Sequence, residues 1–161
     1  MAIIITSIKN ETYHASVYLD DDGRIYFTAD ADIDCDGGKN PHHDPCWQPE
    51  TTLQLNGKSI DADVVPFIVV PPVIVKSVNP VVLGCQAQVT NSRNGKSVLC
   101  VVADLGPKKK LGELSPAAAR SIGIDPNPNT GGEEAPVIFY ELWPGTPALV
   151  NGVEYKLQPS S

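Results

Sequence analysis

The stretch VVADLGPKKKLGELSPAAARSIG, residues 101–123, predicts a strand, a tight loop and a short helix in succession. The apolar run that ends at Asp104 predicts a buried strand, and the Gly-Pro pair after it predicts a turn. Ser115 is suited to cap a helix that starts at Pro116, and Gly123 is suited to end it. Because so short a helix cannot form a core alone, the strands around it must determine the fold.

Short apolar or alternating runs bounded by turn residues recur along the chain, which predicts a mainly β fold with long loops. Asn94 and Gly95 are suited to the positive φ angles at the tip of a hairpin over 81–104. Segments 37–50 and 124–136 are rich in Gly, Pro and Asn and are predicted loops. The expected strands cover residues 3–8, 13–19, 25–30, 52–55, 64–70, 81–89, 97–104, 136–142 and 153–157.

The size and charge of the chain limit its organisation and its partners. With 161 residues and no internal repeat or linker, residues 1–161 are expected to form a single domain. Its 19 acidic and 12 basic residues give a net charge of −7, which disfavours a nucleic-acid partner. No apolar run approaches the ~20 residues of a membrane span, and no signal peptide is recognised. We expect a monomer that does not insert into membranes.

Four cysteines, Cys35, Cys46, Cys85 and Cys100, are an even set. Pairing of Cys35 with Cys46 and of Cys85 with Cys100 would close local loops, but three pairings are possible from four cysteines. Disulfides are expected if the protein works outside the cell, and the sequence leaves the reduced state open as well.

An acidic run follows the strand predicted at 25–30. If that strand continues, the side chains share one face, because side chains alternate along a strand. Their mutual repulsion requires a cation, a basic substrate, hydrogen-bond donors or water. The spacing resembles the first half of a calcium loop, but His43 stands where the bidentate Glu is needed. A looser calcium site and a solvated turn both remain open. The run comprises Asp30, Asp32, Asp34 and Asp36.

The histidines and cysteines suggest no metal centre. His42, His43 and Cys46, with Cys35 and His14 elsewhere, match no standard zinc spacing. Nothing in the sequence places a particular histidine beside a particular cysteine as a nucleophile pair. We therefore assign no metal and no cofactor.

Asp104 and Glu113 flank the loop in the opening stretch and are candidates for acid–base chemistry. Asp104 lies at the end of a predicted strand, and Glu113 lies just before the helix cap Ser115. Glycoside hydrolysis uses two carboxyl groups, ~6.5–9.5 Å apart in inverting enzymes and ~5–5.5 Å apart in retaining ones. The alternatives are that Glu113 only interacts with the helix dipole and that Asp104 only stabilises the turn.

Several segments resemble, in order, the endo-chitosanases of glycoside hydrolase family 75. The resemblance covers roughly residues 27–145, which is most of the chain. The segments that carry it are FTADADIDCDG at 27–37, VADLGP at 102–107, LGELS at 111–115, AARSIGI at 118–124 and DPNPNTGG at 125–132.

This resemblance implies a fold, a reaction and roles for particular residues. The fold would be a six-stranded double-ψ β-barrel with one short helix. The reaction would be inverting hydrolysis of β-1,4 linkages, with Glu113 as general acid and Asp104 as general base. Asp34, next to Cys35, is a rival base by similarity to family 45 endoglucanases. The remaining acidic residues of the run, Asp30, Asp32 and Asp36, would line substrate subsites.

The implied substrate is chitosan, and the family is typically secreted. Lys108, Lys109 and Lys110 lie between the proposed catalytic carboxylates, where they would disfavour a polycation unless they point to solvent. The alternatives are a peptidoglycan-cleaving muramidase or lytic transglycosylase, and a carbohydrate-binding barrel without catalysis. The protein would then act outside the cell or be delivered to a cell wall. Aromatic residues that could stack on sugars are Trp47, Trp143, Tyr26 and Tyr140.

Overall fold

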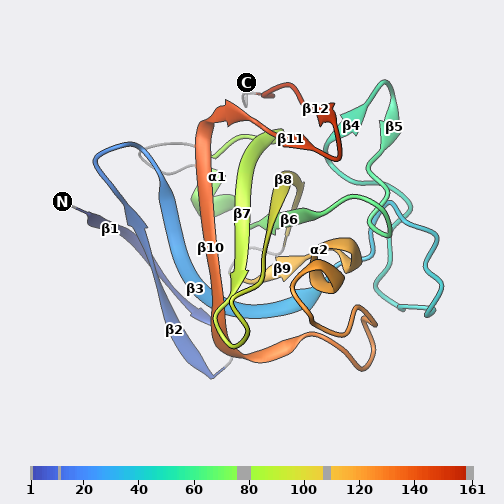
Figure 1. Ribbon diagram of the computed structural model, residues 1–161, viewed down its shortest axis with the longest axis horizontal. Helices are drawn as coiled ribbons and strands as arrows, with labels where there is room; N and C mark the ends of the chain where they lie inside the picture. The colour runs from blue at the N-terminus through green and yellow to red at the C-terminus, as the bar shows by residue number, and fades with distance from the viewer. Residues whose placement is uncertain (1, 11, 76–80, 107–109, 159–161) are drawn as a thin grey trace.

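A computed structural model describes residues 2–10, 12–75, 81–106 and 110–158 (Figure 1). Six strands form a closed barrel, and the parallel pairing of β9 with β3 closes it. The strands in spatial order are β3 (Ile25–Ile33), β10 (Glu133–Pro147), β7 (Cys85–Asn91), β8 (Ser97–Leu105), β6 (Phe67–Val70) and β9 (Glu113–Leu114).

The barrel has an internal two-fold relation. If the barrel strands are numbered in chain order and each is replaced by the strand three places further on, every pair of neighbours again becomes a pair of neighbours. The pairs β7–β10 and β6–β9 are converted into themselves, and the other four are exchanged in twos. Strands β3, β6 and β7 thus correspond to β8, β9 and β10, and the parallel pair β6–β8 corresponds to the parallel pair β9–β3. This is the arrangement expected of a double-ψ barrel, so the predicted fold class is confirmed.

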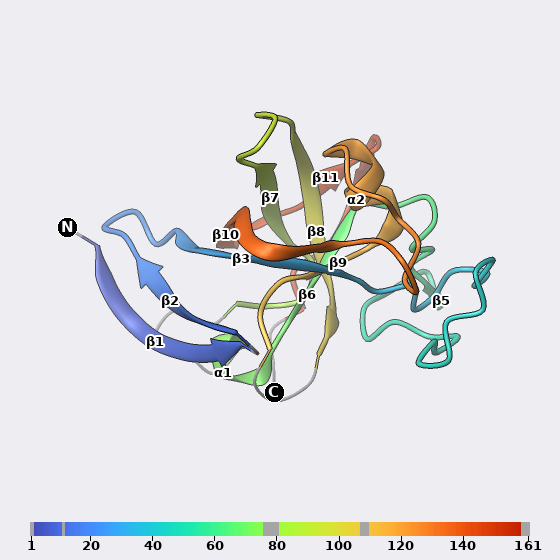
Figure 2. The same cartoon turned by 90° about the horizontal axis from the view of Figure 1, so that it is seen from below.

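The remaining strands and the two helices lie outside the six barrel strands. Strands β1 (Ile3–Asn10) and β2 (Tyr13–Leu19) form a hairpin that extends the sheet beyond β3 (Figure 2). Two small hairpins pair β4 (Gln54–Leu55) with β5 (Lys58–Ser59) and β11 (Leu149–Val150) with β12 (Val153–Glu154). The helices are α1 (Pro72–Val75) and α2 (Pro116–Ser121).

Apolar side chains are buried on both faces of β6 and β8. Cys100 and Val102 of β8 belong to the main core cluster, whereas Val101 and Ala103 belong to a second cluster under the segment around Leu53. A strand that is buried on both faces has a continuous apolar sequence rather than an alternating one. This explains the unbroken apolar run that precedes Asp104 in the sequence.

Most of the expected elements are found, with corrections at short ones. The helix begins after Ser115 as predicted, and the Ser115 hydroxyl accepts a hydrogen bond from the Ala118 N–H. Helix α1 and strands β5, β9 and β11 were not expected, because two- to four-residue elements leave little periodicity to detect. The 81–104 hairpin is confirmed, but of its two predicted tip residues Gly95 has positive φ and Asn94 does not.

The expectation of disulfides is wrong: all four cysteines are free thiols. Cys35 is buried, whereas Cys46 is exposed. Cys100 lies opposite Ala87, so Cys85 is its diagonal neighbour on the same face. Diagonal neighbours lie about 7–8 Å apart, beyond the usual Cα separation of a disulfide. Both thiols are buried, and burial raises the pKa of Cys85 and of Cys100 because it disfavours the charged thiolate.

In the described ranges, none of the helices has the length and apolar character needed to cross a membrane.

Candidate active site

Three acidic residues lie in one row that crosses four neighbouring strands. Asp104 of β8 is paired with Val69 of β6, Val69 is paired with Glu113 of β9, and Glu113 is paired with Asp32 of β3. Directly paired residues direct their side chains to the same face of a sheet. The parallel and antiparallel pairings therefore bring together carboxylates from distant parts of the sequence.

A register irregularity determines the direction of Asp104. Ile68 pairs with Val102, but the next residue, Val69, pairs with Asp104, so Ala103 is skipped. With regular alternation Asp104 would point the same way as Val102, into the main core. The irregularity instead turns Asp104 towards the face of Val69 and Glu113.

Asp104 is buried, at 5% exposure, and is held by hydrogen bonds. Its Oδ1 accepts bonds from the Thr52 N–H at 3.1 Å, the Thr52 hydroxyl at 2.8 Å and the Leu105 N–H at 3.1 Å. The Thr52 segment is in turn tied to β8, because the Leu53 N–H bonds to the Ala103 carbonyl. These donors compensate the burial of the charge and fix the orientation of the carboxylate.

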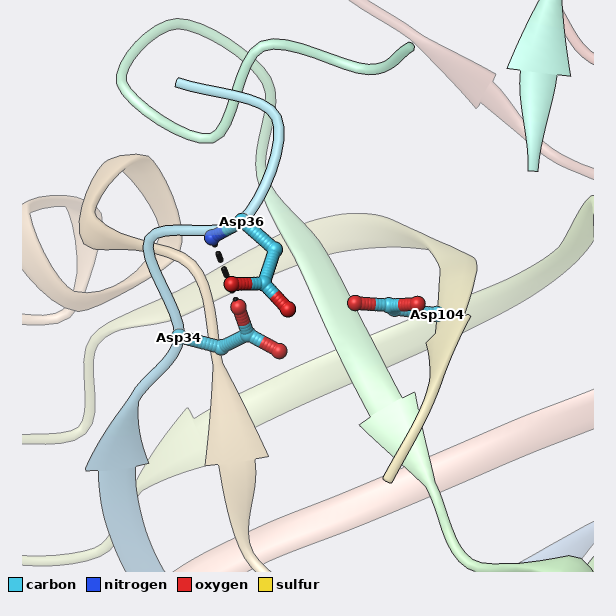
Figure 3. A group of neighbouring side chains, drawn as sticks. All are labelled: Asp34, Asp36 and Asp104. Carbon is cyan, nitrogen blue, oxygen red and sulfur yellow. Dashed lines mark hydrogen bonds between the residues drawn. The ribbon is translucent and has the colours of Figure 1, made fainter. Parts of the chain in front are cut away.

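Asp34 and Asp36 lie just beyond the end of β3 and face Asp104 (Figure 3). The Asp36 N–H donates to Asp34 Oδ1 at 2.8 Å, and the Gln48 N–H donates to Asp36 Oδ1 at 2.8 Å. One carboxylate oxygen from each of the three aspartates lies within 4.8 Å of the others. The strand end and the loop after it therefore bring this part of the acidic run against the end of β8.

A cavity of 220 Å³ opens beside this cluster, next to Glu113. Asp44 and Cys46 of the 37–50 loop form one wall, and Leu105 and Gly106 form another. The remaining lining residues are Ile33, Asp34, Asp36 and Glu113.

Burial and mutual repulsion raise the pKa values of three carboxyl groups at this cavity. Burial raises the pKa of Glu113 to about 7; the Lys110 ammonium lowers it, whereas Asp32 and Asp104 raise it further. Burial together with the repulsion from Asp104 raises the pKa of Asp36 to about 6. The pKa of Asp34 is also raised well above its usual range, chiefly by burial. The site therefore holds protonated carboxyl groups near neutral pH.

Gly106 leaves room for the Glu113 carboxylate. A Cβ atom on Gly106 would lie 2.5 Å from Glu113 Oε2 and 2.9 Å from Val69 Cγ1. Both distances are shorter than a normal van der Waals contact. Gly106, the glycine of the predicted turn, thus provides space at the site.

The predicted site residues divide into three groups. Asp34, Asp36, Asp104 and Glu113 lie at or beside the cavity. Asp32 is ion-paired with Lys110. Asp30 is buried at 8% exposure and accepts a hydrogen bond from the Tyr13 hydroxyl at 2.6 Å. Lys108 and Lys109 lie outside the described residues.

Two residues at the site were missed by the sequence analysis. Thr52 supplies two of the donors to Asp104, and Asp44 lines the cavity. Neither belongs to a motif, and both depend on loops whose paths the sequence does not determine. Of the aromatic candidates, Tyr140 is buried and donates its hydroxyl proton to the Asp30 carbonyl.

The three clustered aspartates offer the hard oxygen ligands that calcium and magnesium prefer. Among residues 2–10, 12–75, 81–106 and 110–158, no other set of three or more potential ligands lies this close together. The calcium spacing seen in the sequence is therefore only partly reproduced: Asp34 and Asp36 join Asp104, whereas Asp32 is paired with Lys110.

No protein-family model matches the chain, and a search of curated proteins found no similar sequence.

Proposed function

We propose that the protein is a glycoside hydrolase that cleaves β-1,4 linkages in an amino-sugar polymer, with chitosan as the first choice of substrate. The observation that carries this proposal is the row in which Asp104 and Glu113 flank Val69 beside an open acidic cavity. One of the two carboxyl groups is suited to hold a proton, and the other is held by hydrogen-bond donors. Glycoside hydrolysis requires such a pair.

In this mechanism Glu113 is the general acid. Its pKa of about 7 leaves it largely protonated in mildly acidic solution and about half protonated at neutral pH, so it can protonate the leaving glycosidic oxygen. Asp104 is the general base. The donors from Thr52 and Leu105 all bond to Oδ1, and Oδ2 is the oxygen that we propose accepts the proton from water.

Asp34 is the rival for the role of base. Its raised pKa favours the protonated form, which cannot accept a proton from water. We therefore assign the base to Asp104 and propose that Asp34 and Asp36 contact the substrate.

The strand spacing favours an inverting reaction. Asp104 and Glu113 lie on strands separated by β6, and two strand spacings amount to about 9–10 Å at the backbone. Carboxyl groups on such positions have room for a water molecule between one of them and the sugar. A retaining pair would be closer together.

The charge of the site favours a cationic substrate. Asp36, whose pKa of about 6 leaves it ionised at neutral pH, and Asp44 line the cavity, where carboxylates could bind the ammonium groups of glucosamine. The positive charge of Lys110 does not contradict this preference for a cationic substrate, because Lys110 is ion-paired with Asp32.

The test compares the wild type with Asp104→Asn and Glu113→Gln on chitosan and on purified peptidoglycan. New reducing ends and the anomeric configuration of the first product are measured. Each variant is expected to lose at least about a hundredfold in kcat on chitosan, and the wild type to invert. Azide, a small nucleophile that needs no general base, is expected to restore cleavage to Asp104→Asn and not to Glu113→Gln.

Matched controls are Asp22→Asn and Glu154→Gln, two exposed acidic residues away from the cavity, which are expected to retain wild-type rates. Binding of chitosan without cleavage would replace the proposal by a carbohydrate-binding barrel. Cleavage of peptidoglycan alone would change the substrate, and 1,6-anhydro ends would identify a lytic transglycosylase. Full activity in both catalytic variants would refute the site.

A further inference from the structure

The β1–β2 hairpin lies outside the closed barrel, yet its tip reaches the segment that leads into β9 (Figure 2). Asn10, the last residue of β1, is buried at 4% exposure. Its side-chain amide donates to the Leu111 carbonyl at 2.9 Å, and its side-chain oxygen accepts from the Leu111 N–H at 3.2 Å. One side chain thus satisfies both polar groups of Leu111, two residues before Glu113.

The other groups around Asn10 hold it in this orientation. Its amide nitrogen lies 2.7 Å from the Tyr13 hydroxyl and 3.3 Å from Asp30 Oδ1. The Tyr13 hydroxyl donates to Asp30 Oδ1 at 2.6 Å and accepts from the Asp30 N–H at 2.8 Å. Asn10 therefore belongs to a buried network in which each described polar contact supports the others.

The segment before Glu113 is also held from the side of β3. The Asp32 N–H donates to the Gly112 carbonyl at 2.7 Å. Gly112 has a φ of +91°, and a Cβ atom there would lie 2.4 Å from Asp30 Oδ1. The backbone of Gly112 thus lies directly against Asp30. The hairpin holds Leu111 and β3 holds Gly112. These contacts fix the position of the backbone from which Glu113 continues.

We propose that Asn10 is a positioning residue for Glu113: it fixes the Leu111 peptide and thereby holds the general acid at the cavity. This inference rests on the proposed function for its catalytic consequence. Asn10 does not touch the substrate in this scheme, so its loss should affect the rate more than substrate binding. The positioning role of Asn10 would also explain how the β1–β2 hairpin, which lies outside the barrel, contributes to the site.

The test compares Asn10→Ala with Asn91→Ala. Asn91 is also buried, at 5% exposure, and its amide donates to the Ile122 carbonyl, at the end of α2 and not at the cavity. Both variants are expected to have a lower melting temperature. Asn10→Ala should also lose about tenfold to a hundredfold in kcat, with KM within about threefold of wild type. Asn91→Ala should retain kcat within about twofold.

A second variant and a second readout keep the test independent of folding and of the substrate. Asn10→Asp retains the shape and one oxygen acceptor but replaces the donor to Leu111 by a second oxygen, which faces the Leu111 carbonyl and Asp30, so a loss of kcat is expected. Independently of catalysis, NMR titration of the Glu113 carboxyl should give a different midpoint in Asn10→Ala and an unchanged midpoint in Asn91→Ala.

Equal losses of kcat in Asn10→Ala and Asn91→Ala, or full kcat in Asn10→Asp, would overturn the positioning role. If the wild type cleaves no polymer, the proposed function fails, and the Glu113 titration still decides whether Asn10 positions this side chain. An unchanged Glu113 midpoint in a folded Asn10→Ala would then refute it.

Discussion

Burial is the main cause of the raised pKa of Glu113, and two oppositely charged residues adjust that pKa further. Lys110 stabilises the ionised form of Glu113 and lowers its pKa, whereas Asp32 destabilises that form and raises it. The two side chains are paired with each other, so their effects on Glu113 partly cancel. The pKa of Glu113, the proposed general acid, is therefore adjusted by a pair of residues of which only Asp32 belonged to the predicted acidic run.

Replacing either partner should shift the pH–rate profile in a direction that depends on the charge removed. Lys110→Met should raise the pKa of Glu113 and move the alkaline limb of kcat/KM to higher pH, because the acid stays protonated longer. Asp32→Asn should move the same limb to lower pH. Shifts in the same direction, or none in either variant, would contradict this electrostatic account.

The residues of the site could be predicted in part. Asp104 and Glu113 were identified because they flank a loop between a strand and a helix, and that local order is visible in the sequence. The alternation of the acidic run suggested a common face, but Asp30 is buried with Tyr13 while Asp34 lines the cavity. That difference depends on which partner strand lies opposite each residue, and pairing is not visible in the sequence.

At the level of elements, Ser115 joins α2 to the strands of the barrel. Its hydroxyl accepts from the Ala118 and Phe67 N–H groups and donates to the Val65 carbonyl, and the residue is fully buried. The cap predicted from the sequence therefore also holds the segment that enters β6. This second role was not predictable, because Val65 and Phe67 lie about 50 residues away in the chain.

Ser115→Ala should lower the free energy of unfolding by about 2–3 kcal/mol, because it removes a helix cap and leaves buried polar groups without their partner. Urea denaturation followed by circular dichroism measures this change. The control is Ser121→Ala in the same helix, an exposed serine whose hydroxyl donates to the Ala117 carbonyl. It should change the free energy by less than about 0.5 kcal/mol. Similar losses in both variants would argue against the joining role of Ser115.

Strand order was the part of the fold that sequence patterns left open. Most long strands were predicted within a few residues, since their apolar runs are bounded by Gly, Pro and Asn. The two-residue strand β9 was missed, although it closes the barrel and carries Glu113. The resemblance to a known family supplied the barrel, whereas periodicity alone supplied only the mainly β class.

For the whole molecule, the raised carboxyl pKa values predict how stability depends on pH. Burial raises the pKa values of Asp30 and Asp36 to about 6 and that of Glu113 to about 7, and raises that of Asp34 as well. The folded protein therefore keeps protons that the unfolded chain releases near pH 4. The stability from these groups is fully present below about pH 4 and is lost as pH rises through the folded-state values.

The free energy of unfolding should accordingly be higher at pH 5 than at pH 8, as measured by urea denaturation at both pH values. Asp34→Asn should reduce this difference and stabilise the protein at pH 8, because the amide keeps the shape without a buried charge. Equal stability of the wild type at the two pH values would contradict the prediction. Asp22→Asn, at an exposed turn, should leave the difference unchanged.

The pairing of β3 with β9 and β10 has a consequence for how the chain folds. β3 begins at Ile25, whereas its barrel neighbours begin at Glu113 and Glu133. During synthesis the partners of β3 in the barrel, β9 and β10, are made only after most of the chain. Pairing between strands so far apart in the sequence makes folding slow. Until β9 and β10 are made, the β1–β2 hairpin is the partner available to β3. The same hairpin that holds Glu113 in the folded protein can thus cover the Ile25–Tyr26 end of β3 in the nascent one.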